Sequence, residues 1–173
     1  MNNEDKRLWD IEKRSDTPER IVFIYEALTK LNLPPDFSII DIAGGRGVVL
    51  NGIAGIFPQC KPTIVDIQRY DYDWGKHRQS IKQVVMPLQD FIEQDDTVYD
   101  VVMMLNSYRN WKKKSKHVPH RDKDRKEFDE WLVKHCKYFI TSGADLSYEQ
   151  GEIRGHDYRN MLQLFRLPLS KII

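Results

Sequence analysis

Two acidic residues and a cluster of glycines have the types and spacing that could hold a nucleotide-like ligand. Asp41 is followed by Gly44, Gly45 and Gly47, which are three glycines within four residues. Glycine adopts positive φ angles and has no Cβ, so the chain can turn sharply there and a ligand can approach the backbone. Asp66 follows about 20 residues later, where a carboxylate can accept hydrogen bonds from both hydroxyls of a ribose. An ordinary strand-to-helix turn followed by a solvent-exposed acid is the alternative.

A strand and a helix are expected to position this turn. Residues 37–42 form a short, β-branched apolar segment of the length of a buried strand, and residues 48–56 have apolar residues at helical spacing. Residues 63–65 predict a second strand that ends at Asp66. In a strand–helix–strand unit the end of the second strand lies beside the loop after the first, so Asp66 is expected close to the glycines.

Strands and helices alternate along the rest of the chain. Thr17-Pro18-Glu19 predicts a helix start, and residues 99–105 are an almost uninterrupted apolar run, typical of a strand that is buried on both faces. The alternation predicts an α/β fold with a doubly wound, mainly parallel sheet and helices on both faces. The other expected elements are an edge-like strand at 84–88, a helix at 127–135, a strand at 138–141, a helical pattern through Tyr158, Met161, Leu162 and Phe165, and a strand at 169–173.

Length and composition predict one globular domain. The chain has 173 residues, of which 40% are hydrophobic and 11% aromatic. No apolar run approaches the roughly 20 residues of a membrane span, and the polar residues 1–16 are expected to form an N-terminal extension. Only two cysteines are present, without a metal-binding or redox spacing. A reducing, cytoplasmic location and no membrane partner are therefore expected.

The glycine turn resembles the first motif of the class I S-adenosylmethionine-dependent methyltransferases. That motif reads acidic-x-Gly-x-Gly-x-Gly, and this chain has Asp41-x-Ala43-x-Gly45-x-Gly47, with Ala43 in place of the first glycine. The dinucleotide pattern Gly-x-Gly-x-x-Gly fails because Leu50 stands where its last glycine should be. The resemblance covers roughly residues 18–143 and implies a Rossmann-like fold, whose final antiparallel hairpin is expected to be reduced or missing.

The resemblance implies S-adenosylmethionine as the cofactor and places its contacts on several loops. Asp66 would hold the ribose, and Asp90, after the third strand, would face the adenine amino group. Asp90 is equally well read as the N-cap of a short helix. The full set implied is Asp41, Ala43, Gly44, Gly45, Gly47, Asp66, Ile67, Gln89, Asp90, Leu105 and Asn106.

The same resemblance places Asn106 and Tyr108 near the methyl group, where either could orient the methyl acceptor. Polar residues that simply cap a loop are the alternative. The adenine-methylating signature Asn-Pro-Pro-aromatic is absent, because Ser107 and Tyr108 stand where prolines would be needed. No residue is identified as a general base; Asp145, Tyr148, Glu149 and His156 are weak candidates.

Charge is unevenly distributed along the chain. Residues 106–126 contain nine Lys or Arg and two acids, so this segment carries +7 while the whole chain carries +1. As a phosphate-binding lip with Tyr108 and Trp111 for base stacking, the segment favours a nucleic-acid substrate, RNA more than DNA, with Lys112, Lys113 and Lys114 as contacts. As a solvated loop it needs no partner. His117 and His120 have no second paired motif, so no zinc site is expected.

Three functions remain open at the level of the sequence. The favoured one is an S-adenosylmethionine-dependent methyltransferase whose acceptor is RNA or another nucleic acid. The second is a non-catalytic regulatory or partner subunit that binds S-adenosylmethionine or S-adenosylhomocysteine. The third is a nicotinamide-dependent Rossmann protein, which binding of NADH would reveal.

Overall fold

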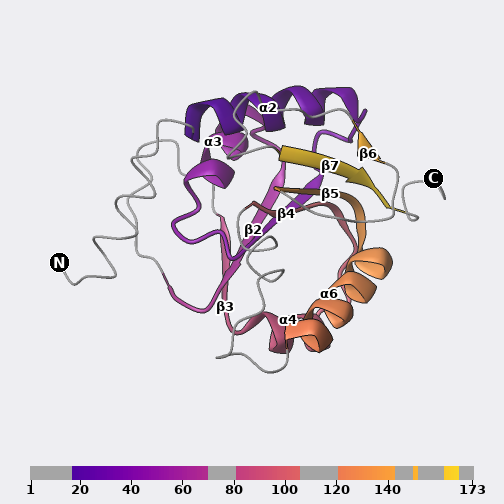
Figure 1. Cartoon of the computed structure of the whole chain (residues 1–173). Helices are drawn as coiled ribbons and strands as arrows, with labels where there is room; N and C mark the ends of the chain where they lie inside the picture. Colours follow the sequence, from indigo (N-terminus) through magenta and orange to yellow (C-terminus); the bar gives the residue numbers. More distant parts are fainter. Residues whose placement is uncertain (1–16, 70–80, 106–120, 143–149, 152–161, 168–173) are drawn as a thin grey trace.

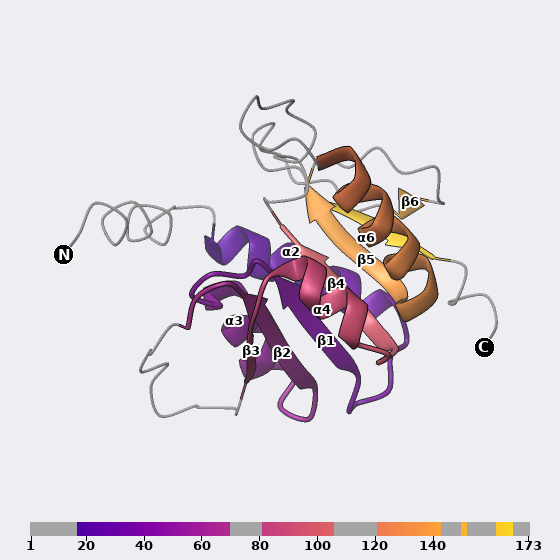
Figure 2. The same cartoon turned by 90° about the horizontal axis from the view of Figure 1, so that it is seen from below.

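A mainly parallel sheet forms the centre of the molecule in the computed structural model, which describes residues 17–69, 81–105, 121–142, 150–151 and 162–167. Five strands run parallel: β1 (Ser38–Ile42), β2 (Lys61–Asp66), β3 (Lys82–Val85), β4 (Tyr99–Met104) and β5 (Cys136–Ser142). Two further strands, β6 (Gln150–Gly151) and β7 (Leu162–Arg166), pair antiparallel to each other, and β7 pairs antiparallel to β5. The order across the sheet is β3-β2-β1-β4-β5-β7-β6, and Figure 2 shows the parallel strands side by side.

Helices cover both faces of this sheet. Figure 1 shows α2 (Thr17–Lys30) and α3 (Val48–Ile56) on one side, and α4 (Leu88–Gln94) and α6 (Arg121–His135) on the other. Alternate strand residues supply the two cores: Ile39, Val101 and Met103 pack toward α2 and α3, whereas the neighbouring strand residues pack toward α4 and α6. The fold class predicted from the sequence is therefore confirmed. None of the described helices is long and apolar enough to cross a membrane.

The C-terminal hairpin is present in a reduced form, as predicted, but its strand β7 corrects the helical pattern predicted through Leu162 and Phe165. Residues 162–166 form a strand and not the continuation of a helix, and β6 is only two residues long. Leu162 and Leu164 pack toward α2 and α3, while Phe165 packs on the opposite face. The apolar residues at 162, 164 and 165 fit a helical period as well as an alternating one. The antiparallel pairing of this segment with β5 shows that it is a strand. Residues 158–161 and 169–173 lie outside the described residues.

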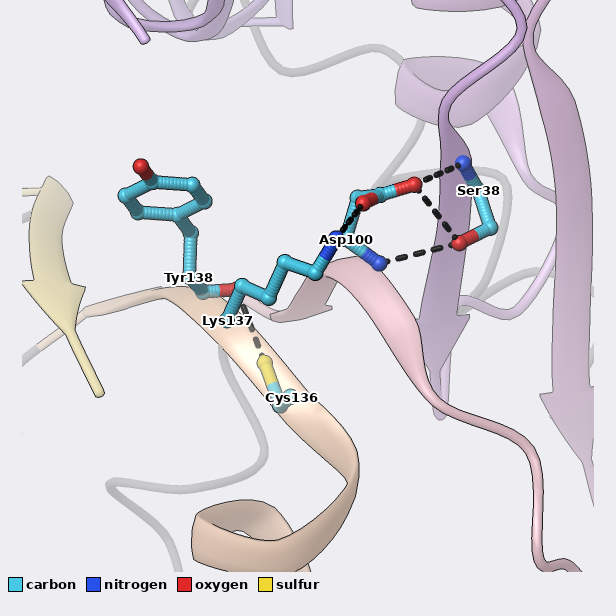
Figure 3. A network of polar contacts seen from close by, with 5 residues as sticks. All are labelled: Ser38, Asp100, Cys136, Lys137 and Tyr138. Atoms are coloured by element: carbon cyan, nitrogen blue, oxygen red, sulfur yellow. Dashed lines mark hydrogen bonds and ion pairs between the residues drawn. The ribbon is translucent and has the colours of Figure 1, made fainter. Parts of the chain in front are cut away.

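A polar clamp ties together the amino ends of β1, β4 and β5 (Figure 3). Asp100 Oδ2 accepts hydrogen bonds from Ser38 N at 2.8 Å and Ser38 Oγ at 3.1 Å, and Asp100 N donates to Ser38 Oγ at 2.9 Å. Lys137 Nζ lies 2.7 Å from Asp100 Oδ1. This edge of the sheet is opposite to the one that carries the glycine turn, so the clamp aligns the strands without contributing to a site there.

We expect Asp100→Asn to lower the free energy of unfolding at pH 7 by about 1–3 kcal/mol, because the part-buried Lys137 loses its charge partner. Burial acts to raise the pKa of Asp100, but hydrogen bonds from Lys137 and Ser38 outweigh it and the net pKa is lowered. A lowered pKa stabilises the fold above the ordinary carboxyl pKa near 4 and loses that effect as pH falls. Urea unfolding should therefore show the difference between wild type and variant shrinking toward pH 3.

The matched control for this prediction is Asp36→Asn. Asp36 also pairs with a lysine, Lys61, at 2.7 Å, but both side chains are more than 60% exposed. Solvent screens such a pair, so no measurable change in stability is expected. Equal losses for the two variants would contradict the assignment of Asp100 as a clamp.

Candidate functional site

The turn between β1 and α3 consists of residues 43–47 and has three positions with positive φ. These are Ala43 at 54°, Gly45 at 55° and Gly47 at 66°. Gly47 is the N-cap residue of α3, and no side chain accepts a hydrogen bond from the first turn at this position. The N–H of Gly47 donates a hydrogen bond to Gly44 O at 2.9 Å. The left-handed backbone bends the chain from strand to helix, and at Gly45 an added Cβ would meet no atom within 4 Å. The backbone of the turn is thus open toward a ligand at Gly45.

Ala43 stands in a conformation that is unfavourable for a residue with a Cβ. The left-handed region costs an L-residue about 1–2 kcal/mol, and glycine adopts it freely. We expect Ala43→Gly to raise the free energy of unfolding by about 0.5–1 kcal/mol, after the larger unfolded-state entropy of glycine is allowed for. Chemical denaturation measures this. Ala54→Gly, in the buried interior of α3, should lower stability by about 1 kcal/mol or more, and a loss for both variants would contradict the strain at Ala43.

Asp66 joins the turn to the ends of β2 and β3. Its Oδ2 accepts a hydrogen bond from Gly45 N at 2.9 Å, and its Oδ1 accepts one from Gln68 N at 3.2 Å. Its backbone oxygen accepts from Met86 N at 3.0 Å. A carboxylate has about four lone-pair positions, so two acceptor positions remain for a ligand. The expected proximity of Asp66 to the glycine turn is therefore present in the structure.

Asp41 lies beneath the turn and is only 3% exposed. A Cβ on Gly44 would stand 2.6 Å from Asp41 Oδ2, so the absence of a side chain at Gly44 leaves room for this carboxyl. Burial raises the pKa of Asp41 to about 7, and the negative charge of Asp66 adds to the effect. Within the described part of the chain no hydrogen bond reaches the Asp41 carboxyl. Two acidic groups therefore lie together at one edge of the sheet.

A small hollow opens beside Gly45 and Asp66, toward the edge strand. It is also lined by Ile64, Gln68 and residues of β3. Ile67, between the lining residues Asp66 and Gln68 in the sequence, is 71% exposed. The hollow combines aliphatic and carboxamide groups, and no sequence pattern indicated that Gln68 and Gln83 would line it.

The remaining predicted contacts come from the loops after β3 and β4. Parallel neighbours end at the same edge: Asp41 is in register with Ile64 and Met103, and Asp66 with Val85. Leu105 directly follows β4 and is buried. Gln89 and Asp90 lie in the first turn of α4, whose N-cap is Pro87, so the alternative of Asp90 as N-cap is wrong. Asn106, Tyr108, Trp111, Lys112, Lys113 and Lys114 lie outside the described residues.

The charges of α6 change the interpretation of the basic segment. Lys123 lies 3.4 Å from Glu127, and the pairs Arg125–Asp129 and Lys126–Glu130 are each at 3.8 Å. Residues 121–135 contain five Lys or Arg and five Asp or Glu, so the helix carries no net charge with His neutral. The excess of positive charge belongs to residues 106–120, which have five Lys or Arg and no acid. Of the predicted basic segment 106–126, only residues 106–120 still favour a polyanionic partner.

Among known proteins, similarity to this chain is found only at the level of the fold, in solved structures. No known family profile matches the sequence, and no curated protein sequence matches it either. Among solved structures, an O-methyltransferase family protein from Burkholderia thailandensis matches 89% of this chain and 56% of its own, with a TM-score of 0.56 and 13% identity. The sugar N-methyltransferase KedS8 from Streptoalloteichus sp. matches 95% and 79%, with a TM-score of 0.54 and 12% identity.

A third similar structure contains a ligand. The plantazolicin methyltransferase BpumL, crystallised with a desmethyl plantazolicin analogue and SAH, matches 80% of this chain and 53% of its own, with a TM-score of 0.51 and 17% identity. At these identities the similarity establishes the fold and leaves the acceptor open. The chain spans about half the length of the first solved structures that it matches.

Proposed function

Because the chain has the Rossmann-like fold of the class I S-adenosylmethionine-dependent methyltransferases, we propose that it binds S-adenosylmethionine and transfers the methyl group to an acceptor. The observation that carries this proposal is the junction of Asp66 with the open turn at Gly45, at the carboxyl edge of a parallel sheet. This is the edge at which doubly wound proteins bind nucleotides. S-adenosylmethionine supplies an electrophilic methyl group on a positively charged sulfur.

Four of the described residues at this edge have a role in the proposal. Asp66 accepts hydrogen bonds from the two ribose hydroxyls with its two remaining acceptor positions, while it continues to hold Gly45 N and Gln68 N. The open space at Gly45 admits the ligand against the backbone. Ile67 offers an exposed apolar surface to the nucleobase, and Asp90 accepts from the adenine amino group.

The protein contributes alignment and exclusion of water to this reaction. Methyl transfer from a sulfonium requires the acceptor to lie in line with the methyl group, and it needs little covalent assistance. Asn106 and Tyr108 come shortly after Leu105, the residue that follows β4 in the sequence, and we assign to them the orientation of the acceptor. An acceptor that carries a proton must lose it during transfer, which a general base on the substrate side would assist.

Isothermal titration calorimetry with S-adenosylmethionine, S-adenosylhomocysteine and NADH tests the cofactor, and transfer of a labelled methyl group tests the activity. Binding of both adenosyl ligands together with transfer supports the proposal. Binding without transfer to any acceptor class would instead favour a non-catalytic cofactor-binding subunit. Binding of NADH alone would overturn the methyltransferase function in favour of a nicotinamide protein.

We further assign RNA as the acceptor class on the basis of residues 106–120. Their five Lys or Arg without any acid, together with Trp111, provide charges for phosphates and a ring for base stacking. Single-stranded RNA should bind with an affinity that falls as salt rises, and replacing Lys112, Lys113 and Lys114 by alanine should reduce the salt slope by about two to three. Replacing Lys123 and Lys126, which are paired on α6, is the control and should change the slope less. A flat salt response would remove nucleic acid as the acceptor.

A further inference from the structure

A buried hydroxyl ties the end of β4 to the end of β5 at the carboxyl edge of the sheet. Thr141 Oγ1 donates a hydrogen bond to Met104 O at 2.7 Å, and the two residues are in register. Both side chains are buried, Thr141 completely. A valine has nearly the shape of threonine and would fill the same space without burying a polar group. Packing alone therefore does not require the hydroxyl at position 141.

This hydrogen bond lies close to the point where the strand order reverses. Strands β1, β2 and β3 follow one another toward one edge of the sheet, and β4 and β5 lie on the other side of β1 (Figure 2). Doubly wound proteins bind their ligands outside the carboxyl ends of the two strands at such a point, which here are β1 and β4. The ligand is therefore expected between the glycine turn, which follows β1, and Leu105, which follows β4.

Different residues hold the two sides of this position. On the β1 side, Asp66 holds the turn through the hydrogen bond from Gly45 N at 2.9 Å. On the β4 side, the hydroxyl of Thr141 holds the carbonyl of Met104, the last residue of the strand. Leu105 comes directly after that carbonyl and is itself buried. A shift of the Met104 carbonyl is therefore passed on to the backbone that faces the expected ligand.

We infer that Thr141 is a positioning residue for the ligand site, because its hydroxyl fixes the carboxyl end of β4. The inference rests on the proposed function and adds to it a residue of β5, a strand to which the proposal assigns no other contact. The side chain of Thr141 has no exposed surface, so it acts on the ligand through Met104 and Leu105. One hydrogen bond between neutral groups changes an equilibrium constant by about threefold to tenfold.

Calorimetric titration of the full chain with S-adenosylhomocysteine tests the inference. Thr141→Val removes the hydroxyl and keeps the shape of the side chain, so the affinity should fall about threefold to tenfold. Thr141→Ser keeps the donor and should bind within about twofold of the wild type. Equal losses for the valine and serine variants would show that the methyl group of Thr141 matters and not its hydroxyl, and would overturn the inference.

The matched control is Ser38→Ala, at the opposite edge of the same sheet. Ser38 Oγ accepts a hydrogen bond from Asp100 N at 2.9 Å and lies 3.1 Å from Asp100 Oδ2, so it also ties two neighbouring strands, β1 and β4. Both Ser38→Ala and Thr141→Val should lower the midpoint of urea unfolding, but only Thr141→Val should weaken binding. Equal weakening of binding by the two variants would mean a general loosening of the sheet, which contradicts the inference.

Hydrogen exchange of the wild type, followed by NMR, gives a second readout that needs no variant. Addition of S-adenosylhomocysteine should slow the exchange of the Met104 and Leu105 amides and leave the amide of Asp100, at the amino end of β4, unchanged. Absence of this protection, or unchanged affinity of Thr141→Val, would overturn the inference, while binding by the wild type would leave the proposed function intact. If the wild type binds neither adenosyl ligand, both are overturned.

Discussion

Gly45→Val should lower the affinity for S-adenosylmethionine at least 100-fold while the protein remains folded. Position 45 has a φ of 55°, and its missing Cβ faces open space beside Asp66. Valine would put two methyl groups into the space that the ligand requires, and a β-branched residue is strongly disfavoured at this φ. Calorimetry gives the affinity, and a thermal melt checks that the fold persists.

Two further variants separate loss of space from backbone strain. Gly45→Ala carries the same strain with a smaller side chain, so its affinity should lie between those of wild type and Gly45→Val. Gly55 also has no atom within 4 Å of an added Cβ, but it lies inside α3. Gly55→Ala should leave binding unchanged and raise stability by about 0.5–1 kcal/mol. If folded Gly45→Val bound the cofactor nearly as well as wild type, the turn would not be the binding site.

The elements next to the proposed site could be predicted from the sequence with good accuracy. Strand β1 and helix α3 lie where the apolar pattern placed them, because a β-branched run, a break of glycines and a helical period leave little ambiguity. The position of Asp66 beside the turn followed from the topology of a strand–helix–strand unit. The order of Asp41, the glycines and Asp66 in the sequence therefore predicted that these residues lie at one edge of the sheet.

Other elements could not be predicted because tertiary contacts or charge pairs decide them. Helix α6 begins at Arg121, six residues before the predicted start, in a segment whose first apolar residue is Phe128. Its early turns are linked by ion pairs between Lys or Arg and acids four residues later, which an apolar pattern does not reveal. The need for a glycine at position 44 beside the Asp41 carboxyl could not be predicted either, because it depends on the three-dimensional course of the turn.

Asp66→Ala tests the residue on which the proposed ribose contact depends. The variant leaves both ribose hydroxyls without a protein acceptor, so the affinity for S-adenosylmethionine should fall by about 1–3 kcal/mol, which is about 5- to 150-fold. Gly45 N and Gln68 N also lose their acceptor, so the ligand-free protein should lose about 1 kcal/mol of stability. Asp66→Asn keeps one acceptor oxygen and should give smaller losses in both measurements.

The two losses distinguish binding from loop support. Asp96, an exposed acid between α4 and β4, lies at the opposite edge of the sheet, so Asp96→Ala should change neither quantity. A lower stability of Asp66→Ala with unchanged affinity would limit Asp66 to support of the turn and would exclude the proposed ribose contact. A loss of affinity larger than the loss of stability, measured by calorimetry and urea unfolding on the same preparations, would show that the carboxylate acts on the ligand itself.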